Sequence, residues 1–166
     1  MKSLTINDGS TQRSLIRSIV VTFDMPVALD AGAFLLVRSN GSIPTLVSDV
    51  SEANGETTVK LTFSGARTSF GSLDDGKWTF RVRHARVHRA DDRATILSVD
   101  RVERFHRFFG DSDGNRNVDA ADQTAFNSAF GQTDGLSLAT FDYDNSGIVD
   151  AADQAQFSKR FGRRIY

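Results

Sequence analysis

The sequence contains no cysteine and no long apolar run, and each absence excludes a class of protein. It also contains only two prolines. Without cysteine the chain has neither disulfide bonds nor a thiolate metal site. No apolar run reaches the ~18 residues that a membrane-spanning helix needs, so we expect no membrane insertion. The first residues, Met1 to Thr5, also lack the apolar core of a secretory signal. A net charge of −1 provides no general attraction to nucleic acid.

The first hundred residues carry the pattern of β-strands. Apolar side chains alternate with polar or smaller ones, which indicates strands with one buried face. The clearest stretches are Ile19-Val21-Phe23, Val59-Leu61-Phe63 and Trp78-Phe80-Val82. Asn40-Gly41, Asn54-Gly55 and Asp75-Gly76 suit hairpin turns. We therefore predict an all-β antiparallel sandwich over residues 1–100, with strands at 15–24, 33–38, 43–50, 57–64, 77–83 and 94–99.

Residues 101–166 are organised by an internal repeat instead. A Phe-x-x-x-Phe-Gly unit occurs three times, ending at Gly110, Gly131 and Gly162. Asp119 to Gln123 has the same sequence as Asp150 to Gln154, 31 residues later (119 to 150). Two Phe residues four apart share one helix face, and glycine suits a helix C-terminus. We therefore predict short helices over 120–130 and 151–161, and a second domain over 101–166.

Two segments of this region have the spacing of a twelve-residue calcium loop. Such a loop provides side-chain oxygens at positions 1, 3, 5, 9 and 12 and a backbone carbonyl at position 7. The loops span residues 111–122 and 142–153. In the first loop the predicted ligands are Asp111, Asp113, Asn115, Asn117 (carbonyl), Asp119 and Asp122. In the second they are Asp142, Asp144, Ser146, Ile148 (carbonyl), Asp150 and Asp153. The sequence predicts two bound Ca²⁺ ions, and the alternative is two acidic loops without metal.

The two loops differ at position 6, where the chain turns sharply. The second loop has Gly147 there, and the first has Arg116. A side chain with positive φ is strained by about 1–2 kcal/mol, although Gly114 could relieve this strain through a different turn. We therefore predict that the second loop binds calcium more tightly. Position 8 is apolar in both loops, at Val118 and Val149, as expected for a residue that pairs the two loops across a core.

One helix follows each loop and no full helix precedes it, so residues 105–164 resemble a type I dockerin domain. The resemblance implies a small all-α domain with paired calcium loops that docks onto a cohesin-type protein partner in polysaccharide-degrading assemblies. In dockerins, loop positions 10 and 11 (often Ser-Thr) and positions 17 and 18 contact cohesin. Here they are Ala120-Ala121 with Asn127-Ser128, and Ala151-Ala152 with Ser158-Lys159. The first domain loosely resembles bacterial immunoglobulin-like modules, and the combination looks like C-terminal regions of large secreted planctomycete proteins.

These observations favour a non-catalytic calcium-binding module that mediates docking between proteins. The alternative is a calcium-stabilised structural cap of an extracellular adhesin or surface protein. An enzyme ranks last, because the sequence has no G-x-S-x-G motif, no cysteine nucleophile and no phosphate-binding loop. Calcium sites of extracellular modules suit high calcium concentrations, so we expect a location outside the cell or at its surface. We also expect the protein to be a monomer.

A basic stretch runs from Arg81 to Arg89 and includes His84, Arg86 and His88. It could bind a polyanion. We favour the simpler interpretation, in which these side chains form the solvated face of a strand that buries Trp78, Phe80 and Val82.

Overall fold

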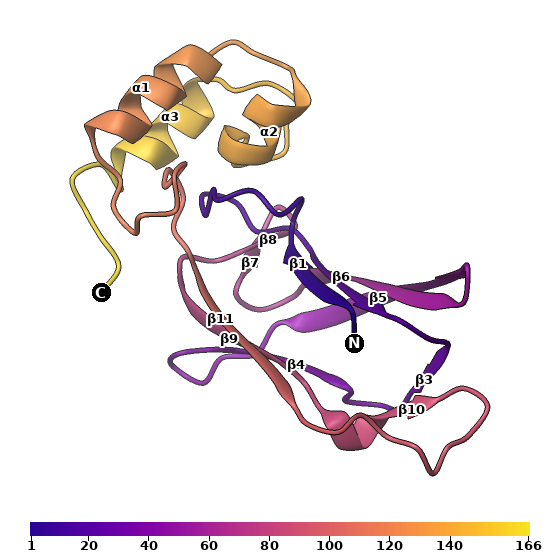
Figure 1. The fold of residues 1–166 in the computed structure, drawn as a ribbon. Helices are drawn as coiled ribbons and strands as arrows, with labels where there is room; N and C mark the ends of the chain where they lie inside the picture. The colour runs from indigo at the N-terminus through magenta and orange to yellow at the C-terminus, as the bar shows by residue number, and fades with distance from the viewer. The chain divides into compact units, whose positions relative to one another are not determined.

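The computed structural model describes all 166 residues, and the chain divides into two compact units (Figure 1). Unit 1 comprises residues 1–9, 17–67 and 78–105. Unit 2 comprises residues 10–16, 68–77 and 106–166. Unit 2 is therefore assembled from three separate stretches of the sequence.

The elements are eleven strands, one 3-10 turn and three α-helices. The strands are β1 (Ser3–Ile6), β2 (Ile19–Phe23), β3 (Val27–Leu29), β4 (Phe34–Arg38), β5 (Thr45–Ala53), β6 (Glu56–Ser64), β7 (Thr68–Ser69), β8 (Ser72–Leu73), β9 (Gly76–Val82), β10 (Val87–Arg89) and β11 (Arg101–Arg107). The turn η1 spans His84–Arg86, and the helices are α1 (Ala120–Ala129), α2 (Gly135–Phe141) and α3 (Ala151–Ser158). None of the helices is long and apolar enough to cross a membrane.

Unit 1 is built on antiparallel sheets that each bury one face. The larger sheet has the order β1-β2-β6-β5, and a three-stranded sheet has the order β11-β9-β4. In the larger sheet Val21 lies opposite Val59, and in the smaller one Leu36 lies opposite Phe80. All four side chains are fully buried. The strands predicted at 15–24, 33–38, 43–50, 57–64 and 77–83 are thus confirmed as β2, β4, β5, β6 and β9. The period-two pattern of burial holds for β2, β6 and β9, whereas β5 is exposed along nearly its whole length.

The predicted strand at 94–99 is wrong. This segment forms turns with a single bridge between Ile96 and His88, and the last strand is β11, over Arg101–Arg107. The apolar residues of the segment are largely exposed, since Val99 is 70% exposed and Ile96 is 43% exposed. Apolar composition indicated a buried strand here, but the segment pairs with β10 only around Ile96, through hydrogen bonds from Arg89 N to Thr95 O and from Leu97 N to Val87 O.

Unit 2 contains an aromatic core beneath its helices. Its buried members are Leu15, Phe108, Phe109, Val118, Phe126, Ala129, Phe141, Val149 and Phe157. Helices α1 and α3 lie side by side (Figure 1), with the Phe126 and Phe157 ring centroids 4.8 Å apart. Phe141 of α2 completes the group, with its ring 5.2 Å from that of Phe126. The repeated Phe residues therefore join equivalent helices of the two repeats.

The predicted fold class, an immunoglobulin-like sandwich followed by a small all-α dockerin-like domain, is wrong. The chain is 36% strand and 17% helix, and no small all-α domain is present. The three helices have only 10, 7 and 8 residues. The unit that holds them also includes the β7–β8 hairpin and residues 10–16. The division into domains 1–100 and 101–166 stays a prediction.

The first Phe-x-x-x-Phe-Gly copy explains part of this error. Phe105 belongs to strand β11, and the chain turns after it, at Phe109 and Gly110. Gly110 has a φ of +99°, and a Cβ added there would lie 2.9 Å from the Cγ1 of Val118. Glycine is required at this position for close packing against the core, whereas the pattern predicted that it ends a helix.

Candidate metal centre

The aspartates at positions 1 and 12 anchor each loop through backbone N–H groups. In the first loop, Asp111 accepts hydrogen bonds from Gly114 N (2.9 Å) and Arg116 N (3.0 Å). Asp122 accepts from Ser112 N (2.8 Å) and Asp119 N (2.9 Å). These bonds fold the loop so that its first and last carboxylates converge.

The second loop repeats this pattern. Asp142 accepts hydrogen bonds from Ser146 N (2.9 Å) and Gly147 N (3.0 Å). Asp153 accepts from Tyr143 N (2.7 Å) and Asp150 N (2.8 Å). Two segments 31 residues apart thus form nearly the same set of hydrogen bonds. The repeat in the sequence is therefore matched by a repeat in local geometry.

Each loop brings three carboxylates together. The groups are Asp111 with Asp113 and Asp122, and Asp142 with Asp144 and Asp153. Within each group one oxygen of every residue lies within 4.8 Å of the others. In each loop, the carboxylates at positions 1, 3 and 12 therefore converge on one point, as the spacing predicted.

The predicted ligands at positions 5, 7 and 9 do not belong to the carboxylate clusters, and they form hydrogen bonds of their own. Asp119 and Asp150, at position 9, cap α1 and α3 by accepting from Ala121 N and Ala152 N. Position 9 of calcium loops often acts through a water molecule, so capping is compatible with that role. Asn115 donates to Asp113 (2.8 Å), and its own oxygen accepts from Asn117 N. The Ser146 hydroxyl donates to the carbonyl of Ile148 (3.1 Å).

The electrostatics of the clusters favours a cation. Asp111, Asp122 and Asp153 are fully buried, and no lysine or arginine forms an ion pair with Asp113, Asp122, Asp144 or Asp153. Burial raises the pKa of Asp153, and the charges of Asp144 and Asp142 act in the same direction. Buried carboxylates that repel one another are stabilised by a divalent ion. Oxygen-only donors in these numbers fit Ca²⁺.

Both loops turn with positive φ at the same two positions. At position 4, Gly114 has a φ of +79° and Asn145 a φ of +61°; at position 6, Arg116 has +76° and Gly147 +88°. The turn is therefore the same in both loops, and Gly114 does not relieve the strain at Arg116. Asn adopts positive φ readily, but a long side chain does not. The strain predicted at Arg116 is present in the backbone.

Replacing Arg116 with glycine is therefore expected to strengthen calcium binding by the first loop. Relief of about 1 kcal/mol of strain corresponds to roughly a fivefold gain in affinity. The reciprocal change, Gly147→Arg, should weaken the second loop by a similar factor. Calorimetry on Asp142→Ala and Asp111→Ala backgrounds isolates each loop and also tests whether the second loop binds more tightly. Unchanged affinity in both reciprocal variants, or a tighter first loop in the parent chain, would contradict this reasoning.

Each loop pairs with the chain segment that follows the other repeat's helix. Gly162 N donates to Val118 O (2.8 Å), and Val118 N donates to Arg163 O (3.0 Å). In the second loop, Gly131 N donates to Val149 O (2.7 Å), and Val149 N donates to Gln132 O (3.1 Å). Val118 and Val149 are both fully buried in the same core, as predicted, although the backbone of each pairs with the segment after a helix.

Residues 10–16 form hydrogen bonds with the start of the first loop and the residue before it, and the sequence did not predict these contacts. Arg13 N donates to Asp111 O (2.9 Å), and Gly110 N donates to the Ser14 hydroxyl (2.8 Å). A Cβ added at Gly114 would overlap the carbonyl oxygen of Thr11. His106 Nε2 also lies 2.6 Å from Asp111 Oδ2. No periodicity or motif identified these partners, because they are far apart in sequence or belong to a strand end.

Asp75 joins two arginines of unit 2. Its Oδ1 accepts from Arg107 Nη1 (2.6 Å) and Phe109 N (2.9 Å), and its Oδ2 accepts from Arg160 Nε (2.6 Å). The Arg107 side chain is 1% exposed, and its Nε and Nη2 have no hydrogen-bond partner. The Cζ atoms of Arg107 and Arg160 lie 5.6 Å and 5.5 Å from the ring centroid of Tyr143, at position 2 of the second loop. Asp75 is thus the main compensation for a buried cation.

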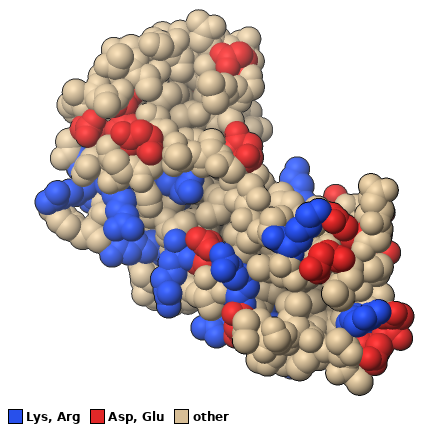
Figure 2. Space-filling model, viewed as in Figure 1, with Lys and Arg blue, Asp and Glu red and all other residues tan.

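The basic stretch of unit 1 is partly neutralised by Asp100. Arg81 Nη1 lies 2.8 Å from Asp100 Oδ2, and His84 Nδ1 lies 2.7 Å from its Oδ1. Acidic and basic side chains are also interspersed on the visible surface (Figure 2). Such a mixture of signs gives a weaker attraction for polyanions than a continuous basic face.

Asp100 should make stability depend on pH in the acid range. Hydrogen bonds from His84 and Arg81 hold the pKa of Asp100 well below its usual value. A carboxylate with a lowered folded-state pKa stabilises the fold above its unfolded pKa, and this contribution is lost as pH falls through the folded value. Wild type should therefore be more stable than Asp100→Asn near neutral pH, and the gap should narrow below about pH 4. Parallel urea titrations across this range measure the gap, and a constant difference would count against the ion pairs.

Comparison with known proteins adds no family to this description. No protein-family model, no curated protein and no solved structure matches the chain.

Proposed function

We propose that this chain is a non-catalytic module that binds two calcium ions, one in each loop. The observation that carries the proposal is the pair of aspartate triplets, each with its oxygens within 4.8 Å and with mostly buried carboxylates. The matching hydrogen bonds to positions 1 and 12 provide further support. Extracellular calcium modules bind at about 10⁻⁴–10⁻³ M, so we also propose a secreted or cell-surface location.

The role best supported for the ions is stabilisation of unit 2. The first loop contacts residues 10–16 and the C-terminal residues, and the second contacts the segment after α1. An ion in either loop would therefore fix segments that are distant in sequence. Because the ion binds the folded loop, its binding free energy adds to the stability of the fold.

Calcium-dependent docking onto a cohesin-like protein partner is the second candidate function. Phe130 and Phe161 occupy equivalent repeat positions, and they are 46% and 47% exposed. The Ala120-Ala121 and Ala151-Ala152 pairs are exposed as well. Aromatic side chains are enriched at the cores of protein–protein interfaces. The likeness to dockerin loops supports this role, although the unit that holds them is not all-α.

Competition with a fluorescent calcium chelator tests the first part of the proposal, since two equivalents of calcium should be withdrawn from the chelator. A pull-down from the secreted proteins of the source organism, with calcium or with EDTA, separates the two roles. A partner retained only with calcium, and lost in a Phe130→Ser/Phe161→Ser variant, would favour docking. Calcium binding without any such partner would favour the structural role. No withdrawal of calcium would reject both.

A further inference from the structure

An aromatic contact joins the beginnings of the two calcium loops. Phe109 lies two positions before Asp111, the first predicted ligand of the first loop. Tyr143 directly follows Asp142, the first predicted ligand of the second loop. The rings of Phe109 and Tyr143 meet edge to face, with their centroids 4.9 Å apart. Two loops that are separate in the sequence are therefore in contact where each one starts.

Two arginines lie against both rings of this pair. The Cζ atom of Arg107 is 5.7 Å from the ring centroid of Phe109 and 5.6 Å from that of Tyr143. The Cζ atom of Arg160 is 5.5 Å from each of the two centroids. Cation–π attraction to both rings therefore adds to the contact between the rings themselves.

Asp75 holds the arginines and the backbone of one ring residue in place. Its Oδ1 accepts from Arg107 Nη1 and Phe109 N, and its Oδ2 accepts from Arg160 Nε. Asp75 follows strand β8 and belongs to neither loop. We call Asp75, Arg107, Arg160, Phe109 and Tyr143 the aromatic bridge. None of these side chains is a predicted calcium ligand.

The aromatic bridge continues into the calcium ligands at both ends. Tyr143 N donates to Oδ1 of Asp153 (2.7 Å), the last predicted ligand of the second loop. Asp111 N donates to Phe108 O (3.0 Å), so the chain turns directly from Phe109 into the first loop. Phe109 is fully buried, so a shift of its ring displaces the closely packed residues around that turn. An ion that orders one loop therefore also restricts the start of the other, and the second ion has fewer groups left to order.

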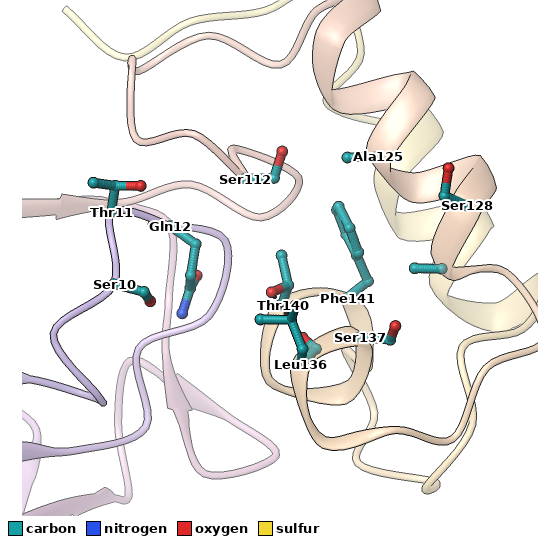
Figure 3. A pocket seen from close by; sticks show the side chains of 11 residues that line it. Ser10, Thr11, Gln12, Ser112, Ala125, Ser128, Leu136, Ser137, Thr140 and Phe141 are labelled. Carbon is teal, nitrogen blue, oxygen red and sulfur yellow. Dashed lines mark hydrogen bonds between the residues drawn. The ribbon is translucent and has the colours of Figure 1, made fainter.

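Two other features of unit 2 involve no residue of the aromatic bridge. The backbone bonds of Val118 and Val149 run to the segments that follow the helices. A cavity of about 490 Å³ between residues 10–12 and helices α1 and α2 is lined by Ser112 of the first loop and by no residue of the second (Figure 3). Substitutions in the aromatic bridge therefore leave these contacts in place and isolate its own contribution.

We propose that the aromatic bridge couples the two calcium sites, so that an ion in one loop raises the affinity of the other. This inference rests on the proposed function, because it concerns how the same two sites act together. Asp75, Phe109 and Tyr143 are positioning residues, since they act through the loops and not on the ion. Coupling between two sites is reciprocal, so each ion raises the affinity for the other by the same factor. The strength of an aromatic pair corresponds to a coupling factor of about 2–10.

Calorimetric titration of the full chain with calcium measures this factor. Asp122→Asn disables the first site and Asp153→Asn disables the second, so each variant reports the affinity of one site alone. The association constant of the parent chain for both ions should exceed the product of the two single-site constants. We expect the ratio, which is the coupling factor, to be about 2–10 in the parent chain.

Tyr143→Leu tests whether the aromatic bridge carries the coupling. Leucine keeps an apolar side chain but removes the ring, so the coupling factor should fall to about one while both sites still fill. Tyr143→Phe keeps the ring and should keep the factor. Arg160→Gln removes one cation from both rings outside the core and should also lower it. Phe70→Leu is the matched control, because Phe70 contacts the Tyr143 ring (centroids 5.9 Å apart) but is 58% exposed and lies outside the aromatic bridge.

The possible failures are distinguishable. A merely structural role for Tyr143 would lower the single-site affinities and leave the coupling factor unchanged in Tyr143→Leu and Arg160→Gln, which would overturn the proposal. Equal loss of coupling in Phe70→Leu would overturn it as well. Two filled sites with a factor of one in the parent chain would reject coupling and leave the proposed calcium binding intact, whereas no uptake of calcium would reject both.

Discussion

Removing calcium with EDTA is expected to lower the free energy of unfolding by about 5 kcal/mol. At a calcium concentration a hundred times the dissociation constant, each site adds about 2.7 kcal/mol, and two sites add together. The physical reason is that Asp111, Asp122 and Asp153 are fully buried and repel neighbouring carboxylates when no ion is bound. Thermal unfolding followed by circular dichroism, with calcium or EDTA, measures the difference.

Substitution of one ligand should remove about half of this calcium effect. Asp122→Asn keeps the side-chain shape but removes a charge from the first cluster. Asp134→Asn is the matched control, because Asp134 caps α2 outside the loops and asparagine is an equally good cap. Magnesium should not replace calcium, since it holds its water ligands and requires octahedral geometry. Equal calcium stabilisation in Asp122→Asn and the control would show that the first loop holds no ion.

Asp75→Ala is expected to destabilise the protein by about 3 kcal/mol. Breaking a buried ion pair by removing one partner leaves the other charge uncompensated. Arg107 would then be buried with no hydrogen-bond partner for its side chain, and Arg160 would lose its 2.6 Å contact. Burial already lowers the pKa of Arg107, and the charge of Asp75 opposes that shift. Chemical denaturation measures the loss.

An exposed ion pair provides the comparison for this variant. Asp91 pairs with Arg89 at 2.8 Å, but its side chain is 70% exposed. Surface pairs of this kind contribute little to stability because solvent screens the charges, so Asp91→Ala should have little effect on the free energy of unfolding. If Asp75→Ala and Asp91→Ala lowered the free energy of unfolding by the same small amount, Asp75 would not compensate the charge of the buried Arg107. If Arg107→Met restored stability in the Asp75→Ala background, the loss would be traced to the unpaired charge.

The clustering of carboxylates in the two acidic loops could be predicted because the loop geometry is encoded locally. All predicted ligands lie within twelve consecutive residues, and the repeat places the same residue types at the same positions twice. The convergence of positions 1, 3 and 12 follows from that local pattern. The strain at Arg116 could also be predicted, because position 6 of such a loop requires positive φ.

The assembly of unit 2 could not be predicted in the same way. Asp75 contacts Arg107, which is 32 positions away in the sequence (75 to 107), and Thr11 lies against Gly114 of the first acidic loop, which is 103 positions away (11 to 114). Hydrophobic periodicity reports which face of an element is buried, but not what covers it. The Phe-x-x-x-Phe-Gly repeat also did not fix the secondary structure of its copies, because the first copy begins in a strand and the other two begin in helices. The all-α prediction failed at these two points.

We propose that the chain holds two calcium ions, one in each of the loops 111–122 and 142–153. Isothermal calorimetry with calcium tests it most directly, using the parent chain beside Asp122→Asn and Asp153→Asn. We predict two ions per chain for the parent and one for each variant, with the tighter site lost in Asp153→Asn. No calcium uptake by the parent chain, or uptake that both substitutions leave unchanged, would contradict the claim.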